Sequence, residues 1–219
     1  MEPLPHGYTN RTVRHGRTVT KSYRGPDAAE RRERELTALR ALHGRIPVPS
    51  VVGSGSEPTM EYVEGEHGQE LIDSGQAAGV LRACGELLRR FQVIAPADVF
   101  PNQPGQVLVH GDYGPNNILL DPATLQIAAV VDWEWAHRGD PIEDLAWCEW
   151  IVRAHHPRHV DRLGELFDTY GERPAWSDRQ QAMLTRQRSL VDFAERWEPD
   201  GAAGQLWRRR IAATETWTE

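Results

Sequence analysis

The chain has 219 residues, of which 39% are hydrophobic and 26% charged, a balance typical of a globular protein and not of a disordered or fibrous one. Its formal net charge of −7 disfavours binding to a nucleic-acid backbone. No apolar run approaches the length of a membrane span, and the N-terminus lacks a secretory pattern, so we expect a cytoplasmic protein without a membrane partner.

The N-terminal part of the chain predicts strands around one helix. Residues 11–23 carry β-branched and aromatic residues on both sides of His15-Gly16, which predicts an antiparallel strand pair with Lys21 on its second strand. Asp27 is a candidate N-cap for a helix in which Leu36, Leu39 and Leu42 recur at helical spacing and beside which Glu35 lies. Prolines 47 and 49 end that helix.

A break in the pattern follows the next strands. Residues 50–63 predict a short strand pair that ends in MEYVEG, and Gly65 begins a loop-like composition. We therefore place a boundary here, between a small N-terminal lobe of residues 1–64 and a larger C-terminal lobe of residues 65–219.

The C-terminal part predicts one long helix, three short strands and then further helices. Apolar residues keep helical spacing from residue 75 to 93, and short apolar strands are predicted at 107–110, 118–120 and 127–131. Asp140 and Glu143 have the spacing of a capping box at the start of a helix. Cys84 and Cys148 fall inside helical patterns and are predicted to be buried free thiols. The histidines of residues 155–159 are predicted to be exposed.

The residues that carry chemistry stand in the loops between the three short strands. The segment HGDYGPNN covers residues 110–117, and Asp132 follows at the end of the apolar strand in VVDWEW. An aspartate and an asparagine five positions apart on one tight loop can accept a hydroxyl proton and bind a metal ion, and a second aspartate on an adjacent strand end can bridge the metal to phosphates. Such oxygen ligands suit Mg²⁺, and the set suits phosphoryl transfer.

These motifs resemble the aminoglycoside phosphotransferase family of kinase-like enzymes. The resemblance rests on HGDYGPNNILLD and VVDWEWAHRGDPIEDLAW, with weaker similarity in ERELTALRAL and MEYVEG, and it extends from about Lys21 to Trp147. It implies an α+β fold of two lobes like that of protein kinases, with a reduced N-terminal β lobe, a mostly helical C-terminal lobe, and nucleotide bound between them.

The resemblance also implies roles for single residues. Asp112 would be the catalytic base, and Asn117 and Asp132 would hold Mg²⁺. Lys21 would pair with Glu35 and contact the phosphates of ATP or GTP. The backbone from Glu61 to Val63 would receive the base. Glu134 and Asp144 match supporting positions.

Simpler explanations compete with these roles. Asp112 and Asn117 could only cap a turn, and Lys21 and Glu35 could be surface residues. Asp144 could stabilise a helix dipole or hold the catalytic loop. Trp133 and Trp135, beside Glu134, could line a substrate pocket or pack in the core.

Two features depart from the family pattern. No glycine-rich loop precedes Lys21, where only Gly7 and Gly16 are available, so the means of covering a triphosphate is unassigned. Asn116 stands where the family usually has glycine, and Tyr113-Gly114 replaces a common Leu-His pair.

The expected activity is Mg²⁺-dependent transfer of a γ-phosphoryl group to a hydroxyl of a small molecule. Only seven residues separate Asp132 from Asp140, which leaves no room for the long activation segment of a protein kinase. An acidic second lobe favours a cationic antibiotic such as an aminoglycoside, whose inactivation would give resistance, with a nucleoside-type antibiotic as the next candidate. A choline-like or homoserine-like metabolite remains an alternative, as does a nucleotide-binding pseudokinase. The sequence leaves open whether the protein is a monomer or a homodimer.

Overall fold

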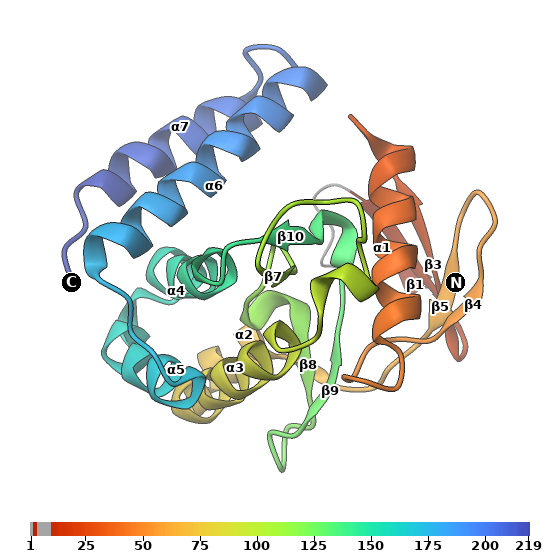
Figure 1. Cartoon of the computed structure of the whole chain (residues 1–219), viewed down its shortest axis with the longest axis horizontal. Helices are drawn as coiled ribbons and strands as arrows, with labels where there is room; N and C mark the ends of the chain where they lie inside the picture. Colours follow the sequence, from red (N-terminus) through yellow and green to blue (C-terminus); the bar gives the residue numbers. More distant parts are fainter. Residues whose placement is uncertain (1, 4–9) are drawn as a thin grey trace.

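The computed structural model describes residues 2, 3 and 10–219 (Figure 1). Gly7, one of the two glycines considered above for covering a triphosphate, lies outside the described residues. No helix in the described part of the chain is both long and apolar enough to cross a membrane.

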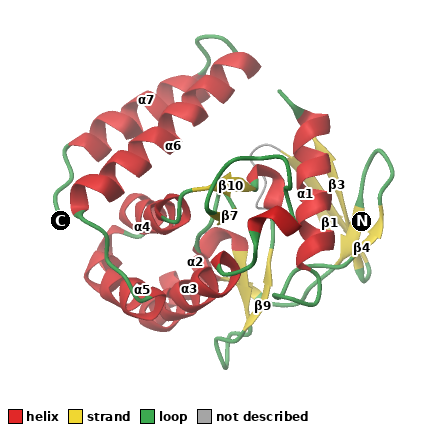
Figure 2. Ribbon diagram, in the orientation of Figure 1, coloured by secondary structure: helices red, strands yellow, loops and turns green. Residues whose placement is uncertain are grey.

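The N-terminal part is a five-stranded antiparallel sheet with one helix against it. The sheet order is β1-β2-β3-β5-β4, and its strands are β1 (Glu2–Pro3), β2 (Asn10–His15), β3 (Thr18–Tyr23), β4 (Val51–Gly53) and β5 (Thr59–Glu61). β2 and β3 form the predicted hairpin, in which Thr12 pairs with Lys21. Helix α1 (Ala28–Leu42) lies beside the sheet (Figure 2) and buries Leu36, Leu39 and Leu42, as their spacing predicts.

Two small sheets carry the loops of the central motif. One has the order β6-β8-β9 and is formed by β6 (Glu66–His67), β8 (Ile118–Leu120) and β9 (Ile127–Val130). The other pairs β7 (Val107–Val109) with β10 (His137–Gly139), a strand that the sequence did not predict. The stretch from residue 62 to 65 joins the first sheet to β6, and the lobe boundary placed there stays a prediction.

The rest of the molecule is helical. Its α-helices are α2 (Gly68–Leu71), α3 (Ala77–Gln92), α4 (Ile142–His155), α5 (Leu163–Tyr170), α6 (Trp176–Trp197) and α7 (Ala202–Glu215). Short 3₁₀ turns cover Pro96–Asp98, Pro115–Asn117, Trp133–Trp135 and Pro157–Arg162, and a π-helical turn covers Ile72–Gln76. α3 packs on α5, while α6 packs on both α4 and α7. This arrangement is the expected two-lobe, kinase-like α+β fold.

The hydrophobic core of the described residues has two clusters, one that extends from α1 to α5 and one between α4 and α6, and its cysteines are free. Cys84 and Cys148 are buried and unoxidised, as their positions predict. The expectation for the histidines was wrong at His156, which is only 5% exposed because its Nδ1 lies 2.9 Å from a carboxylate oxygen of Asp73 and its ring packs into the helical part.

The predicted helix starts differ in outcome. At α4, the Ile142 N–H donates to Asp140 and the Asp140 N–H donates to Glu143, so the capping box is formed. At α1, Asp27 makes no side-chain cap, which corrects the expectation. Its backbone is left-handed, with φ of 55°, and its carboxylate lies 2.7 Å from Arg196 Nη2 instead.

The far end of α6 reaches the N-terminal part of the molecule. Trp197, at the end of the helix, lies so close to Gly25 that a Cβ atom on Gly25 would approach the indole ring to 2.5 Å. The neighbouring Arg196–Asp27 ion pair joins the same two segments. One helix therefore contacts α4 near its beginning and the loop before α1 near its end (Figure 1).

Candidate active site

The loop between β7 and β8 is held in place by a buried carboxylate from α4. Asp144 accepts hydrogen bonds from the backbone N–H groups of His110, at 2.6 Å, and Gly111, at 2.9 Å. Gly111 has a φ of 82°, and a Cβ atom there would come within 2.6 Å of the Trp135 carbonyl oxygen, so only glycine fits. Asp144 thus does what one of the sequence alternatives proposed: it fixes the loop by hydrogen bonds.

Asp112 follows this glycine and has two side-chain donors. Trp147 Nε1 donates to Asp112 Oδ1 at 2.8 Å, and Asn117 Nδ2 donates to Asp112 Oδ2 at 2.9 Å and to its carbonyl at 2.8 Å. Burial raises the pKa of Asp112 to about 6, against the opposing effects of the Arg186 charge and of these hydrogen bonds. A carboxylate with that pKa is mostly ionised at neutral pH and can accept a proton, which suits a general base.

Lys21 connects three elements at the opposite side of the site. Its Nζ lies 2.6 Å from Glu35 Oε2 on α1 and 2.5 Å from Asp132 Oδ1 after β9, and the side chain is 6% exposed. Tyr23 also donates to Glu35. Burial lowers the pKa of Lys21, but the surrounding carboxylates raise it more, so the pKa lies above its usual value and the ammonium stays charged.

Asp132 is the part of this cluster that solvent can reach. Its side chain is 29% exposed, whereas that of Glu35 is 2% exposed. Burial raises the pKa of Asp132, but Lys21 lowers it more, and the net shift is downward. The structure therefore presents one ionised carboxylate at the edge of a buried charge cluster.

The donor atoms fit a magnesium ion held by Asn117 and Asp132. The Val131 N–H donates to the Asn117 carbonyl at 3.0 Å, which ties the two predicted ligands together through the backbone. Because the Asn117 amide nitrogen faces Asp112, its side-chain oxygen is directed away from that carboxylate, and Asp132 keeps a second oxygen beyond the one that meets Lys21. Both are the hard oxygen donors that Mg²⁺ prefers.

A second group of carboxylate oxygens lies close by but is occupied. Oxygens of Glu35, Asp132 and Glu134 all lie within 4.8 Å of one another. Glu35 is engaged by Lys21, and Glu134 Oε2 receives Arg31 Nη1 at 2.7 Å. Lys21 meets Asp132 as well, but Asp132 is the member of the group that solvent reaches, so Glu35 and Glu134, which are both buried, are weaker metal candidates than Asp132.

The segment predicted to receive the nucleotide base lies directly after β5. The Glu61 N–H donates to the Ser50 carbonyl at 2.9 Å, and the next N–H, that of Tyr62, donates to Arg17 at 2.9 Å. Within the described residues, the backbone N–H and C=O groups of Val63 have no hydrogen-bond partner. Of the two predicted residues, Val63 thus has the backbone groups that remain available to a base.

The three residues predicted for the acceptor have different surroundings. Trp133 is fully buried and packs on His110 and Phe91, with its Nε1 donating to Val130 at 3.1 Å. Glu134 is 1% exposed and forms the buried pair with Arg31. Of the three, only Trp135 is partly exposed, so it is the one whose side chain is accessible.

Two residues beside Asp112 were not identified from the sequence. Trp147, on α4, donates to the carboxylate, and Arg186, on α6, stacks near both Trp147 and Trp135. Trp147 lies one turn after Asp144 on the same helix, and that spacing could have indicated it. Arg186 lies in a helix with many charged residues, and no local pattern singles it out.

Comparisons with known proteins identify a family. The family described as "Phosphotransferase enzyme family" has a model that matches residues 1–105 and 97–181. Among curated proteins, Acyl-CoA dehydrogenase family member 11 of Gallus gallus is 38% identical over 80 residues, which make up 36% of this chain and 10% of that protein. Acyl-CoA dehydrogenase family member 10 of Mus musculus is 40% identical over 47 residues, 22% of this chain and 4% of that protein. The matches thus span a small part of both relatives.

Solved structures show the same fold at low identity. An aminoglycoside phosphotransferase in complex with GDP and kanamycin has a TM-score of 0.74 and 14% identity, with 98% of this chain and 92% of that one covered. A choline/ethanolamine kinase family protein from Mesorhizobium loti has a TM-score of 0.68 and 17% identity, with coverage of 98% and 86%.

Proposed function

This chain belongs to the phosphotransferase enzyme family, and on that premise we propose that it transfers the γ-phosphoryl group of ATP or GTP to a hydroxyl of a small molecule. The observation that carries the proposal is the placement of Asp112. Its carboxylate is oriented by Trp147 and Asn117, on a loop fixed by Asp144, across from the cluster of Lys21 and Asp132. A turn-capping role would not require this convergence of the 110–117 loop, helix α4, strand β3 and the end of β9.

The proposed step uses few groups. The acceptor hydroxyl gives its proton to the Asp112 carboxylate while its oxygen forms a bond to the γ-phosphorus. The bond from that phosphorus to the β,γ-bridging oxygen breaks, and the nucleoside diphosphate leaves with the electron pair. Lys21, kept charged and oriented by Glu35, binds phosphate oxygens, and Val63 offers backbone groups to the base. Mg²⁺ held by Asn117 and Asp132 would neutralise phosphate charge.

Both donor nucleotides stay open for this chain. Neighbours of the same fold bind GDP, as in the kanamycin complex, and ADP, as in another aminoglycoside phosphotransferase. These likenesses support a nucleotide donor and do not separate adenine from guanine.

The acceptor has two candidates. An aminoglycoside, with resistance through its inactivation, is supported by the chain's acidity and by the kanamycin complex of the first neighbour. A metabolite alcohol is supported by the choline/ethanolamine kinase family neighbour. A pseudokinase is the third reading, and it is disfavoured because Asp112, Asn117 and Asp132 all have geometry suited to catalysis.

The test is phosphate transfer from labelled ATP and GTP to a panel of antibiotics, amino alcohols and hydroxy acids, with and without Mg²⁺. We expect transfer to at least one acceptor, dependent on the metal. Calorimetry should show nucleotide affinity rising with Mg²⁺ in the native protein, and Asp132→Ala should remove that gain while Asn117→Ala reduces it less. Nucleotide binding that ignores Mg²⁺, together with no transfer to any acceptor, would leave the pseudokinase reading instead.

A further inference from the structure

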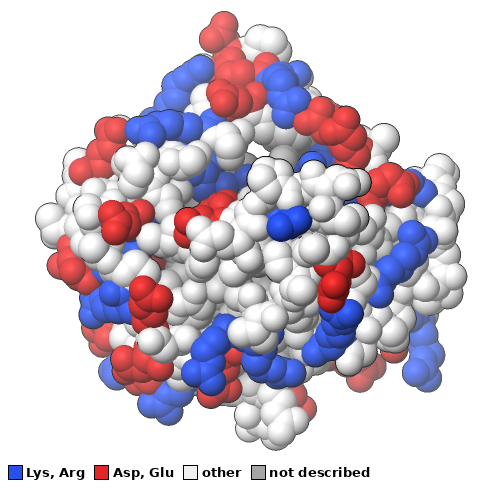
Figure 3. All heavy atoms as spheres, viewed as in Figure 1, with Lys and Arg blue, Asp and Glu red and all other residues white. Residues whose placement is uncertain are grey.

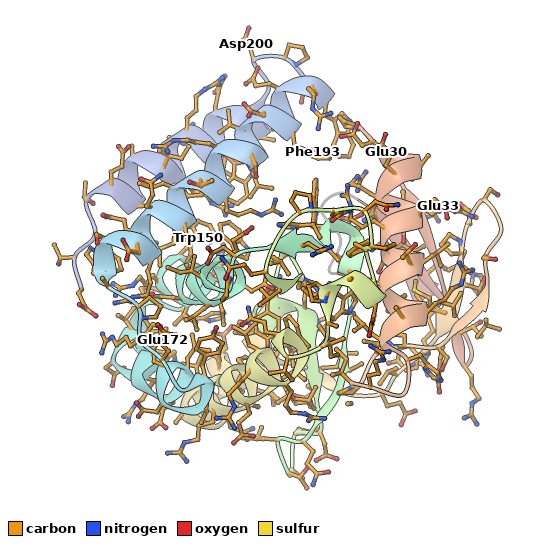
Figure 4. All side chains as sticks on the ribbon, in the orientation of Figure 1. Glu30, Glu33, Trp150, Glu172, Phe193 and Asp200 are labelled. Atoms are coloured by element: carbon orange, nitrogen blue, oxygen red, sulfur yellow. The ribbon has the colours of Figure 1, made fainter. Side chains whose placement is uncertain are left out.

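Arg186 lies on the acceptor side of Asp112. Its Cζ is 5.0 Å from the ring centroid of Trp135 and 5.7 Å from that of Trp147. Trp147 in turn donates to Asp112 Oδ1 at 2.8 Å, so a single indole side chain connects the guanidinium to the proposed base. Figure 3 shows a hollow between the α6–α7 pair and the rest of the molecule, with Lys or Arg atoms on its wall. Figure 4 shows Phe193, about two helical turns after Arg186 on α6, directed toward α1, where Arg31 Cζ lies 5.3 Å from its ring centroid.

This guanidinium has no carboxylate partner. Among the described residues, no Asp or Glu oxygen lies within the 4.0 Å of an ion pair with Arg186, and its Nε is buried without a hydrogen-bond acceptor. Its one side-chain hydrogen bond is long, from Nη1 to Ser189 Oγ at 3.3 Å. A buried N–H without an acceptor destabilises a folded protein, so its retention beside the site indicates a ligand that accepts from it.

The nearby carboxylates are engaged elsewhere. The charges of four carboxylates act on Arg186, and each carboxylate has another partner. Asp112 accepts hydrogen bonds from Trp147 and Asn117, and Asp144 accepts from two backbone N–H groups. Glu143 is paired with His137, and Glu134 with Arg31. Rotation of Arg186 toward Asp112 would also break its stacking on the two indole rings. Among the described residues, the guanidinium is therefore held beside the acceptor hollow without a carboxylate in ion-pair contact, although the charge of Asp112 acts on it from farther away.

We infer that Arg186 binds a carboxylate of the acceptor, so that the substrate of this site is a hydroxy acid and not a polycationic aminoglycoside. The inference rests on the proposed phosphotransferase function and names its substrate class. A guanidinium fork matches the two oxygens of a carboxylate, and one cation balances one negative charge. A polyamine, by contrast, would bring further cations against an unneutralised one. The Trp135 and Trp147 rings supply the flat walls between which the carbon chain of the acid lies.

The test compares Arg186→Gln with Arg188→Gln. Both variants remove one positive charge from α6, but Arg188 is exposed and contacts none of the site residues. The acceptors are hydroxy acids of graded chain length, their neutral amides, choline and kanamycin. We expect the native protein to prefer one hydroxy acid over its amide. Arg186→Gln should raise the KM for that acid roughly 10- to 100-fold with little change for the amide, because only the acid loses a charge-assisted hydrogen bond. Arg188→Gln should match the native protein.

Other patterns of KM and kcat across the acceptors would overturn the inference. If Arg186→Gln lowers kcat equally for every acceptor, Arg186 acts on Asp112 or on the phosphoryl group and not on a carboxylate. Preference of the native protein for choline or kanamycin over all hydroxy acids would also overturn it, while leaving the phosphotransferase function intact.

Binding measured without turnover separates the inference about the acceptor from the proposed phosphotransferase function. Calorimetry and tryptophan fluorescence can follow the hydroxy acids in the Asp112→Asn background, since Trp135 and Trp147 border the site. Binding that Arg186→Gln removes and Arg188→Gln keeps would support the inference even if no acceptor were phosphorylated. Absence of binding by the whole series would overturn it. Should Arg186→Gln fail to fold, Arg186→Lys keeps the charge without the fork and should show a smaller rise in KM.

Discussion

The two sides of the site differ in how their charges are balanced. On the donor side, Lys21 is held by Glu35 and Asp132, and Arg31 by Glu134, so each cation meets a carboxylate within 2.7 Å. On the acceptor side, Arg186 meets two indole rings and no carboxylate among the described residues. The cations of the donor side are thus paired before any ligand binds, whereas the acceptor side has a cation without an ion-pair partner among the described residues.

That difference reflects what each side must recognise. A nucleoside triphosphate is the same donor for many acceptors, so its site can be built from internally satisfied groups and needs no adjustment. An acceptor site has to discriminate, and an unneutralised charge held in place is one way to do so. Four predictions test this difference between the two sides, and the one with the strongest expected effect comes first.

The largest effect is expected at Asp112, which lies between the two sides. Asp112→Asn should lower turnover by roughly 10²–10⁴ for every acceptor, about 3–5 kcal/mol of barrier, because the asparagine cannot accept the hydroxyl proton. Nucleotide binding measured by calorimetry should stay close to native. Turnover that survives the change would remove Asp112 from the mechanism.

The next effect is on stability and concerns the donor side. Arg31→Met leaves the buried Glu134 carboxylate without its guanidinium counter-charge, although Asn10 still donates to it, and this should lower the free energy of unfolding in urea by about 3–5 kcal/mol. Glu134→Met added to Arg31→Met should restore much of that loss, because the pair is removed together. If the double variant is no more stable than Arg31→Met alone, Arg31 and Glu134 are not energetically coupled.

A smaller effect is expected where α6 meets the N-terminal part. Gly25 has a φ of +76° and the Trp197 ring against it, while Gly44 has a φ of +78° and nothing within 4 Å. Gly25→Ala should cost about 1–3 kcal/mol of unfolding free energy, and Gly44→Ala should show only the backbone part, about 1 kcal/mol. Equal losses in the two variants would mean that the Trp197 contact contributes nothing.

The smallest effect is a pH dependence on the acceptor side. Burial lowers the pKa of His137, but the hydrogen bond with Glu143 and its charge raise it more, so the pKa lies above its usual value. The pair therefore stabilises the folded state fully below about pH 6.5, and its contribution is lost as pH rises through the folded-state pKa. Both side chains are over a third exposed, so the contribution should stay under about 1 kcal/mol.

The measurement is urea unfolding between pH 5 and 9 on the native protein and on Glu143→Gln, which keeps the capping oxygen but not the charge. The native protein should lose more stability than the variant across that range. Parallel curves would show that His137 titrates without regard to Glu143.

Single donor-side positions could be predicted from the sequence because each lies in a local pattern, whereas the pairing of Lys21 with Glu35 was implied only by the family resemblance, and the contact of Lys21 with Asp132, 111 residues away, was not predicted. Asp112 and Asn117 share one loop, Asp132 ends an adjacent apolar strand, and Lys21 falls on a strand whose alternation is clear. The lack of a side-chain cap at Asp27 could not be predicted, since its partner Arg196 is far away in sequence. Nor could β10, which forms only because β7 lies beside it.

The acceptor side was predicted less well for the same physical reason. The pattern around Asp132 indicated Trp133, Glu134 and Trp135 alike, yet the 3₁₀ turn that contains them buries the first two and leaves only the third partly exposed. Arg186 lies at the site because α6 packs on α4. The spacing of residues within either helix does not specify that contact. Net charge does not specify the charge at the site, because an acidic chain can present a cation there.

Helix α6 carries Arg186 in its middle and Trp197 at its end, and 22 residues at 1.5 Å per residue make it about 33 Å long. It connects the two parts of the molecule, because it packs on α4 and its last residue contacts Gly25. A rotation of one part relative to the other would therefore have to tilt α6 or break the contact between Trp197 and Gly25. The residue proposed to bind the acceptor and the contact that joins α6 to the N-terminal part therefore lie on a single helix, so substitutions in α6 selected for a new acceptor should also change the free energy of unfolding.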